Sequence, residues 1–251
     1  MRESVNTLER DLAPAPPPAL DPARTALFLD LDGTLAHIAA RPRDVLPSPE
    51  RTRLLKAVGE RLGGRLAVIS GRTLSDIDSI LQGSVTAAAA VHGLVRRNAA
   101  GAVFTRPPHP ALNTARIALD WLVDQPGILV EDKRLGLAVH YRRAPEREGE
   151  VLAACRKVAE TSGLVLQLGH MVAELRTPGP DKGDSVRAFM DEAPFKDATP
   201  VFVGDDLTDE DGFEAAAALG GYGVLVGEAR RTAARHALPD VDAVLAWLAA
   251  P

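Results

Sequence analysis

The sequence predicts an α/β fold in which an open parallel sheet carries helices on both faces and holds an inserted small α+β unit. In the first and last parts of the chain, short unbroken apolar runs alternate with helical patterns, as expected of strands buried on both faces. Three of these runs end in polar residues followed at once by a turn. The middle of the chain instead has pairs of short strands beside two helical patterns, which indicates a separate α+β unit.

The core elements are expected in the following order. Strands are expected at the four apolar runs 26–31, 65–69, 200–203 and 222–226. Helices are expected at the amphipathic segments 49–62, 74–81, 182–191 and 209–219. Ligands of open parallel sheets bind outside the carboxyl ends of the strands. The polar residues that end the first three strands should therefore meet in one crevice.

The domain boundaries are expected at changes of composition. Residues 1–23 are expected to form a flexible leader, because Pro14 and Pro16–Pro18 disfavour regular structure. The catalytic core should comprise residues 24–107 and 180–251, and the α+β unit residues 108–179. Prolines at both edges of this unit suit hinges. Its expected helices are 113–123 and 145–161, and its expected strands are 127–130, 135–141, 164–168 and 171–175.

Composition excludes several classes of protein. The net charge of -5 and the aromatic content of 4% argue against a nucleic-acid-binding protein. A single cysteine, Cys155, allows no disulfide within the chain. No apolar run approaches the roughly 20 residues that a membrane span needs, so a cytoplasmic protein without a membrane partner is expected. A site for an anionic substrate must then be built locally.

Two carboxylates separated by one residue follow the first strand, in the sequence Asp30-Leu31-Asp32-Gly33-Thr34. One carboxylate could attack phosphorus, and the other could protonate the leaving oxygen and later accept a proton from water. The same residues could also form a plain polar turn, since Asp-Gly is a common turn pair.

A second acidic motif follows the third strand, where five acids fall within residues 205–211. Carboxylates at this density repel one another unless a cation is present, and a set of oxygen ligands favours Mg²⁺. Helix capping explains Thr208 and Asp211 but leaves Asp205 and Asp206 unexplained.

Two weaker motifs carry positive charge. Ser70-Gly71-Arg72 follows the second strand and could cradle a phosphate with a hydroxyl, a flexible backbone and a guanidinium. Lys182 stands at an expected helix start and could neutralise a phosphoryl group. Each motif alone could equally be an ordinary loop or a solvated lysine.

Together, in this order, the four motifs resemble the haloacid dehalogenase superfamily of aspartyl phosphotransferases. The resemblance implies a Mg²⁺-dependent enzyme with Asp30 as the nucleophile, Asp32 as the general acid/base and Lys182 as a further catalytic residue. It implies phosphate binding by Ser70, Gly71, Arg72 and Lys182. The metal would be held by Asp30, Asp32, Asp205, Asp206 and Asp209.

A closer resemblance, to the trehalose-6-phosphate phosphatase family, rests on segments such as His92-Gly93, 131–133, 137–142 and 174–176. It implies hydrolysis of trehalose 6-phosphate through a phospho-aspartate on Asp30, under a cap formed by the α+β unit. It also implies a functional link to a trehalose-6-phosphate synthase. The chain departs from the family pattern at His170 and Thr177. The substrate contacts implied are His92, Glu131, Lys133, His140, Arg142, Glu174 and Arg176.

Three alternatives stay open at this point. The first is a related phosphatase that acts on sucrose phosphate or mannosylglycerate phosphate. The second is a sugar phosphomutase on the same scaffold. The third is a module that binds a sugar phosphate without turnover.

Overall fold

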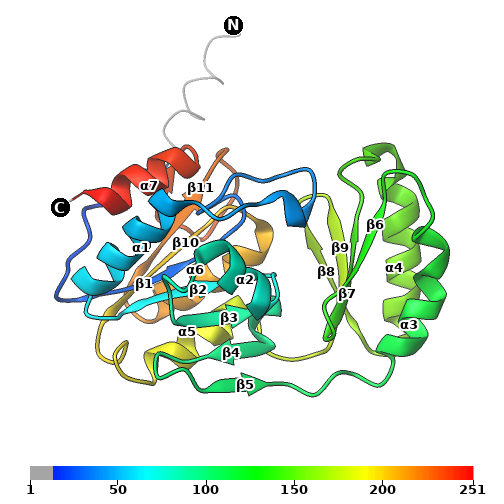
Figure 1. The fold of residues 1–251 in the computed structure, drawn as a ribbon, viewed down its shortest axis with the longest axis horizontal. Coiled ribbons are helices and arrows are strands. Elements are labelled where there is room, and N and C mark those ends of the chain that lie inside the picture. Colours follow the sequence, from blue (N-terminus) through cyan, green and yellow to red (C-terminus); the bar gives the residue numbers. More distant parts are fainter. Residues whose placement is uncertain (1–13, 251) are drawn as a thin grey trace, which may run out of the picture.

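The computed structural model describes residues 14–250, and its main feature is an eight-stranded sheet in the order β12-β11-β10-β1-β2-β3-β4-β5 (Figure 1). The six strands from β12 to β3 are parallel, whereas β4 and β5 pair antiparallel. The predicted α/β class with a large parallel sheet is confirmed. The strands of this sheet are β1 (Thr25–Leu29), β2 (Leu66–Ile69), β3 (Ala87–Ala90), β4 (Val95–Arg97), β5 (Val103–Thr105), β10 (Thr199–Gly204), β11 (Tyr222–Val226) and β12 (His236–Leu238).

Helices cover both faces of this sheet. On one face, α1 (Pro49–Arg61), α2 (Leu74–Leu81) and α7 (Val241–Ala249) bury their apolar residues against side chains such as Leu27 and Leu29. On the other face, α5 (Lys182–Met190) and α6 (Glu210–Ala218) pack around Phe28. Successive residues of a strand point to opposite faces, so an unbroken apolar strand such as β1 supplies both cores.

A second sheet, in the order β6-β7-β9-β8, is antiparallel throughout. It consists of β6 (Leu129–Asp132), β7 (Gly136–His140), β8 (Val165–Gly169) and β9 (Val172–Arg176). The helices α3 (Leu112–Leu119) and α4 (Glu148–Ser162) cover one of its faces, to the right in Figure 1.

The strands of this second sheet alternate between the two faces. In β9, Ala173 and Leu175 pack in the apolar core under the helices, whereas Glu174 lines a cavity on the other face. In β7, Val139 packs in that core and His140 lines the cavity. The period of two therefore directs polar residues of β7 and β9 toward the end of the large sheet (Figure 1).

The expected strands and helices of both parts are present, with ends shifted by a few residues. The structure adds elements for which the sequence analysis had no expectation: β3, the β4–β5 hairpin, β12 and α7. The predicted leader lies partly outside the described residues. Within 14–23, Ala15 bridges to His236 and Leu20 is buried in the core beneath α1 and α7. Among the described residues, no helix has both the length and the apolar character of a bilayer span.

Candidate active site

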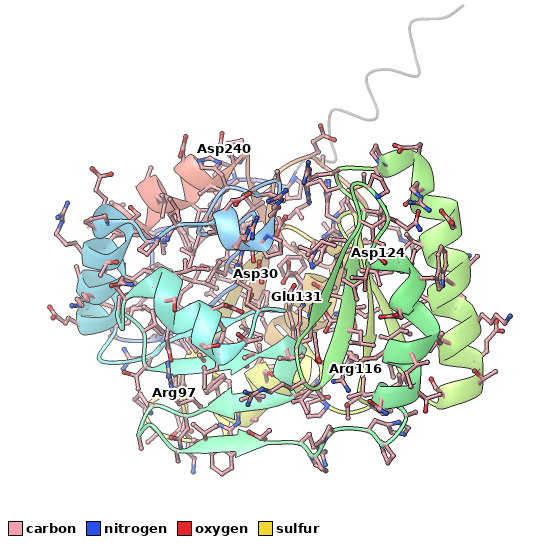
Figure 2. All side chains as sticks on the ribbon, turned by 45° about the vertical axis from the view of Figure 1, so that its right-hand side comes forward. Asp30, Arg97, Arg116, Asp124, Glu131 and Asp240 are labelled. Carbon is pink, nitrogen blue, oxygen red and sulfur yellow. The ribbon has the colours of Figure 1, made fainter. Side chains whose placement is uncertain are left out.

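A cavity lies where the carboxyl ends of β1, β2 and β10 meet the polar face of the second sheet. In Figure 2, Asp30 and Glu131 lie on the two sides of this junction, whereas Arg97, Arg116 and Asp240 lie toward the periphery. Both parts of the chain contribute to the wall, as expected of ligands bound at the strand ends of an open sheet. The predicted site residues that line it are Asp30, Asp32, Ser70, Gly71, Arg72, His92, Glu131, Lys133, His140, Arg142, Glu174, Lys182, Asp205 and Asp206.

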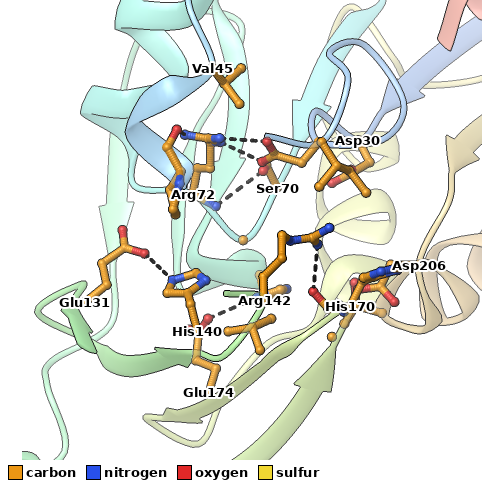
Figure 3. Close-up of a pocket in the computed structure, with 18 of the residues that line it drawn as sticks. Asp30, Val45, Ser70, Arg72, Glu131, His140, Arg142, His170, Glu174 and Asp206 are labelled. Carbon is orange, nitrogen blue, oxygen red and sulfur yellow. Dashed lines mark hydrogen bonds and ion pairs between the residues drawn. The ribbon is translucent and has the colours of Figure 1, made fainter. Parts of the chain in front are cut away.

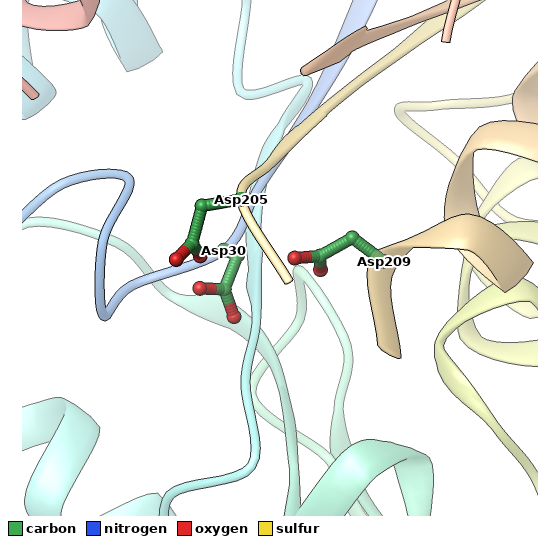
Figure 4. Close-up of side chains that lie close together, drawn as sticks. All are labelled: Asp30, Asp205 and Asp209. Carbon is green, nitrogen blue, oxygen red and sulfur yellow. The ribbon is translucent and has the colours of Figure 1, made fainter. Parts of the chain in front are cut away.

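Three carboxylates meet beside this cavity: Asp30 and Asp205 line it, and Asp209 is fully buried next to them (Figure 4). Asp30 follows β1, Asp205 follows β10, and Asp209 ends the short 3-10 helix Leu207–Asp209. One carboxylate oxygen from each lies within 4.8 Å of the others. The structure thus brings together three of the five predicted metal ligands. Asp32 and Asp206 line the same cavity but lie outside this group.

Lys182 links two of these carboxylates from the first turn of α5. Its Nζ donates to Asp30 Oδ1 at 2.8 Å and to Asp209 Oδ1 at 2.6 Å, and the lysine is only 3% exposed. Burial would lower the pKa of Lys182, but the negative charges of Asp209 and Asp30 outweigh it and raise that pKa. The ammonium therefore stays charged and fixes both acids.

One lysine does not balance three acids, of which Asp30 and Asp209 are buried and Asp205 is partly buried. Burial, with the charges of Asp209 and Asp32, raises the pKa of Asp30 to about 7 despite the attraction of Lys182. Burial, with the charges of Asp30 and Asp209, raises the pKa of Asp205 to about 9. Asp205 Oδ1 is buried and lacks a hydrogen-bond partner among the described residues. An orphaned carboxylate oxygen beside two more carboxylates is the donor set that a divalent cation such as Mg²⁺ requires.

Gly33 gives Asp205 the space for this position. Its φ of +83° is in the left-handed region that favours glycine, and a Cβ there would lie 2.1 Å from Asp205 Oδ2. The glycine after the paired acids is thus needed twice, for the turn and for the close approach of the second acidic motif.

Asp32 is held by an arginine from the neighbouring strand end. Arg72 donates to both carboxylate oxygens, at 2.6 Å from Nε and 2.7 Å from Nη2, and its Nη1 donates to the Pro42 carbonyl at 2.9 Å (Figure 3). The backbone N–H of Arg72 donates to Ser70 Oγ at 3.3 Å. Arg72, predicted to bind phosphate, therefore already occupies both oxygens of the expected general acid/base.

A second cluster of buried charges faces the acids from the α+β unit. Lys133 Nζ donates to Glu174 Oε2 at 2.6 Å and to the Gly71 carbonyl at 2.9 Å. His92 Nε2 lies 3.5 Å from Glu174 Oε2. Burial would raise the pKa of Glu174, but Lys133 and His92 lower it well below its usual range. Burial opposes the charged form of Lys133, yet Glu174 and Glu131 raise its pKa. This cluster is therefore balanced in charge.

Further polar residues of the unit surround the cavity (Figure 3). His140 Nε2 lies 2.8 Å from Glu131 Oε2. Arg142 donates to the His170 carbonyl at 3.0 Å, and the His170 N–H donates to Asp206 Oδ2 at 3.1 Å. His170, where the chain departs from the family pattern, thus joins the two parts through its backbone.

Arg176 is the one predicted contact that does not line the cavity. It is 7% exposed, and its Nη1 donates to the Pro180 carbonyl at 3.1 Å, where the chain returns to the large sheet. Conversely, sequence analysis missed Gln167, which lines the cavity and lies 2.9 Å from His92 Nδ1. Gln167 is the neighbour of Glu174 on the adjacent strand of the antiparallel sheet. The alternation of residues along its strand gives only a weak sequence signal that this side chain lines a site.

His92 owes its place to an uncommon backbone. Val91 and His92 have φ of 47° and 57°, in the left-handed region that β-branched residues rarely adopt. Such strain persists where surrounding contacts determine it, often at functional sites. A Cβ on Gly71 would lie 2.5 Å from His92 Nε2, so glycine at 71 is what admits this ring.

Comparison with known proteins identifies the family. The trehalose-phosphatase family model matches residues 28–241. This chain belongs to the trehalose-phosphatase family. The Escherichia coli (strain K12) trehalose-6-phosphate phosphatase is 36% identical over 229 residues, covering 90% of this chain and 86% of that protein.

Solved structures agree on the fold. The C-terminal domain of a C. albicans trehalose-6-phosphate phosphatase is 21% identical, with a TM-score of 0.80 over 92% of this chain and 96% of that one. A phosphatase of the haloalkanoate (HAD) superfamily from Bacteroides thetaiotaomicron is 19% identical, with a TM-score of 0.59 over 92% and 95% of the two chains. The predicted membership of the trehalose-phosphatase family is confirmed, and the two solved structures support the predicted fold.

Proposed function

We propose that this chain is a phosphoric monoester hydrolase that converts trehalose 6-phosphate to trehalose and inorganic phosphate, with Mg²⁺ as its metal. The observation that carries the proposal is the meeting of Asp30, Asp205 and Asp209, two of them bonded to Lys182, at a cavity that Asp30, Asp205 and Lys182 line. Its family, and the activity named for the E. coli relative, supply the substrate.

The metal would be held by Asp30 and Asp205, with Asp209 beside them on Lys182. When bound, Mg²⁺ would neutralise charge on the phosphoryl oxygens. Lys182 adds a fixed positive charge at the same place, while Ser70 and the backbone of Gly71 lie at the neighbouring strand end.

In the first step, a carboxylate oxygen of Asp30 forms a bond to phosphorus as the bond to the sugar oxygen breaks. The departing oxygen takes a proton from Asp32, which must first exchange its Arg72 contacts for the substrate. In the second step, water attacks the phospho-aspartate and gives its proton to Asp32. Asp30 is then regenerated and phosphate is released.

The α+β unit is proposed to act as the cap that selects the sugar, with the boundaries expected from the sequence. Its balanced cluster of Lys133 and Glu174 offers donors and acceptors but little net charge. Such groups suit neutral hydroxyls, which both donate and accept. His92, Glu131, His140 and Arg142 are proposed as further contacts, whereas Arg176 would act by holding the return to the core.

The test is phosphate release from trehalose 6-phosphate with Mg²⁺, with and without a chelator. Sucrose phosphate and mannosylglycerate phosphate serve as competing substrates, ranked by kcat/KM. Free trehalose as the product excludes a phosphomutase, which would yield a moved phosphate. A higher kcat/KM with another sugar phosphate would show that trehalose 6-phosphate is not the preferred substrate, but it would leave the proposed reaction mechanism unchanged.

Asp30→Asn should lower turnover by at least about 10⁴-fold, because the attacking oxygen is lost. Asp124→Asn, an exposed substitution on the α+β unit, is the matched control and should leave turnover unchanged. Near-normal activity of Asp30→Asn would refute the phospho-aspartate mechanism. A trehalose-6-phosphate synthase that supplies the substrate, and action in the cytoplasm, are proposed on the family resemblance.

A further inference from the structure

A second cleft adjoins the cavity over Asp30. The arginine cleft, as we name it, is lined by Arg41 and Arg43 from the loop after β1 and by Arg142 and Arg143 after β7. The residues that line both hollows include Arg41, Arg72, Glu131 and Arg142, so the two are continuous, whereas Arg43 and Arg143 line the cleft alone.

The arginine cleft has an excess of positive charge. Within residues 14–250, its four arginines form no ion pair, and only Arg142 makes a side-chain hydrogen bond, to the His170 carbonyl.

The two acids of the cleft already have partners of their own. Asp76 accepts a hydrogen bond from the Thr73 hydroxyl, and Glu131 is paired with His140 at 2.8 Å. Arg72 is likewise committed to Asp32. The four arginines thus outnumber the two carboxylates of the cleft, and none of the four forms an ion pair with either acid.

We infer that the arginine cleft binds a second phosphate-class dianion, apart from the phosphoryl group that reacts at Asp30. Guanidinium groups bind phosphate oxygens through pairs of parallel hydrogen bonds, and arginines on both walls can share one dianion. Neutral sugar hydroxyls would not need the charge of Arg43 and Arg143, which line only the cleft. The dianion is either free inorganic phosphate or the phosphate of a second phosphorylated sugar.

Occupancy of the cleft has a consequence for the site next to it. A dianion there lies beside the Arg72 guanidinium, which holds both oxygens of Asp32. The anion and Asp32 then compete for the same cation. Phosphate bound in the cleft would thereby weaken the contacts between Arg72 and Asp32, the proposed general acid/base, without binding at the acid cluster.

Isothermal titration of the Mg²⁺-loaded protein with inorganic phosphate tests the inference. The double variant Arg43→Gln/Arg143→Gln removes two exposed arginines that line only the cleft and lie outside the catalytic machinery. The control Arg53→Gln/Arg156→Gln removes two exposed arginines on α1 and α4, with the same change of net charge. Unchanged thermal unfolding of both variants verifies their folding.

Wild type and control should bind two phosphates per chain, and the double variant one, or a second with at least about tenfold weaker affinity. Equal binding by the double variant and the control would overturn the inference. A parallel titration with glucose 6-phosphate identifies the source of the dianion. The ligand, inorganic phosphate or glucose 6-phosphate, whose affinity falls more in the double variant is the one that the cleft binds. Because binding is measured without turnover, failure of the proposed reaction would show separately, as absent hydrolysis.

Discussion

Two clusters of buried charge face each other across the cavity, and they differ in balance. At the strand ends of the large sheet, three carboxylates share one lysine, and the pKa values of Asp30 and Asp205 are raised to about 7 and about 9. On the antiparallel sheet, Glu174 and Lys133 form a close pair in which each stays charged. In the first cluster the acids outnumber the lysine that contacts them, whereas in the second one lysine faces one carboxylate, although Glu174 Oε1 is also buried without a hydrogen-bond partner among the described residues.

The difference indicates that the two clusters are suited to different groups of the ligand. Uncancelled charge in a buried site is costly, so it persists where a ligand supplies the missing charge. A balanced pair keeps donors and acceptors in place without attracting ions. The large sheet is thus suited to a metal and a phosphoryl group, and the antiparallel sheet to uncharged hydroxyls.

Among the variants that compare the two clusters, the largest effect is expected at Lys182, the only side-chain cation within residues 14–250 that forms an ion pair with the acid cluster. Lys182→Met should destabilise the metal-free protein by about 3–5 kcal/mol, because it leaves buried carboxylates without a partner. Turnover should fall by at least about 10³-fold. Urea denaturation and steady-state kinetics measure the two effects. Full activity in this variant would contradict the role of Lys182 in charge neutralisation.

Breaking the balanced pair should cost somewhat less. Glu174→Gln leaves Lys133 charged and buried, so unfolding free energy at pH 7 should fall by about 3 kcal/mol. The Glu174→Gln/Lys133→Met double variant removes the lone charge and should recover much of this loss. Simple addition of the two single costs would show that the pair is not coupled.

The stability difference between wild type and Glu174→Gln should also depend on pH. The folded-state pKa of Glu174 lies below its ordinary value of 4.5, so its stabilisation is complete above that pH. It is lost as the pH falls from about 4.5 toward the folded-state pKa, where the protonated side chain resembles glutamine. The stability difference between wild type and Glu174→Gln should therefore narrow below pH 4.5.

A smaller effect is expected at Gly33, where the chain offers a closely matched control. Gly33→Ala places a Cβ against Asp205 and should raise the Mg²⁺ concentration for half-maximal activity by about tenfold. Gly101→Ala is the matched control, since Gly101 also has a positive φ of +86° but nothing within 4 Å of its Cβ position. Both should lose about 1 kcal/mol of stability, but only the first should change the metal requirement.

Much of the large sheet and its strand-end acids could be predicted from the sequence, because unbroken apolar runs and the polar residues after them are local signals. β3 could not, because Ala87–Ala90 consists of alanines, which have little strand propensity, and only its burial makes it a strand. The Arg72–Asp32 pair and the Gln167–His92 contact join residues 40 and 75 positions apart. Such partners depend on how distant elements pack.

The roles assigned to the cavity residues stay predictions, and they rest on different kinds of argument. Asp30 and Asp205 follow from their places at strand ends and Lys182 from its place at a helix start, and the three lie together in the structure. The contacts of the α+β unit rest on resemblance, and a strand of alternating residues does not reveal which sugar its polar face would hold.

The most direct test of the account is the thermal unfolding midpoint of wild type and Asp205→Asn with and without Mg²⁺. At a metal concentration about 100 times its Kd, binding contributes about 2.7 kcal/mol, which corresponds to a rise of about 5–10 °C for a chain of this size. The account predicts this rise in wild type and its loss in Asp205→Asn, whose metal-free midpoint should be no lower. An unchanged wild-type midpoint, or an equal rise in the variant, would contradict the claim that the acid cluster lacks one cation.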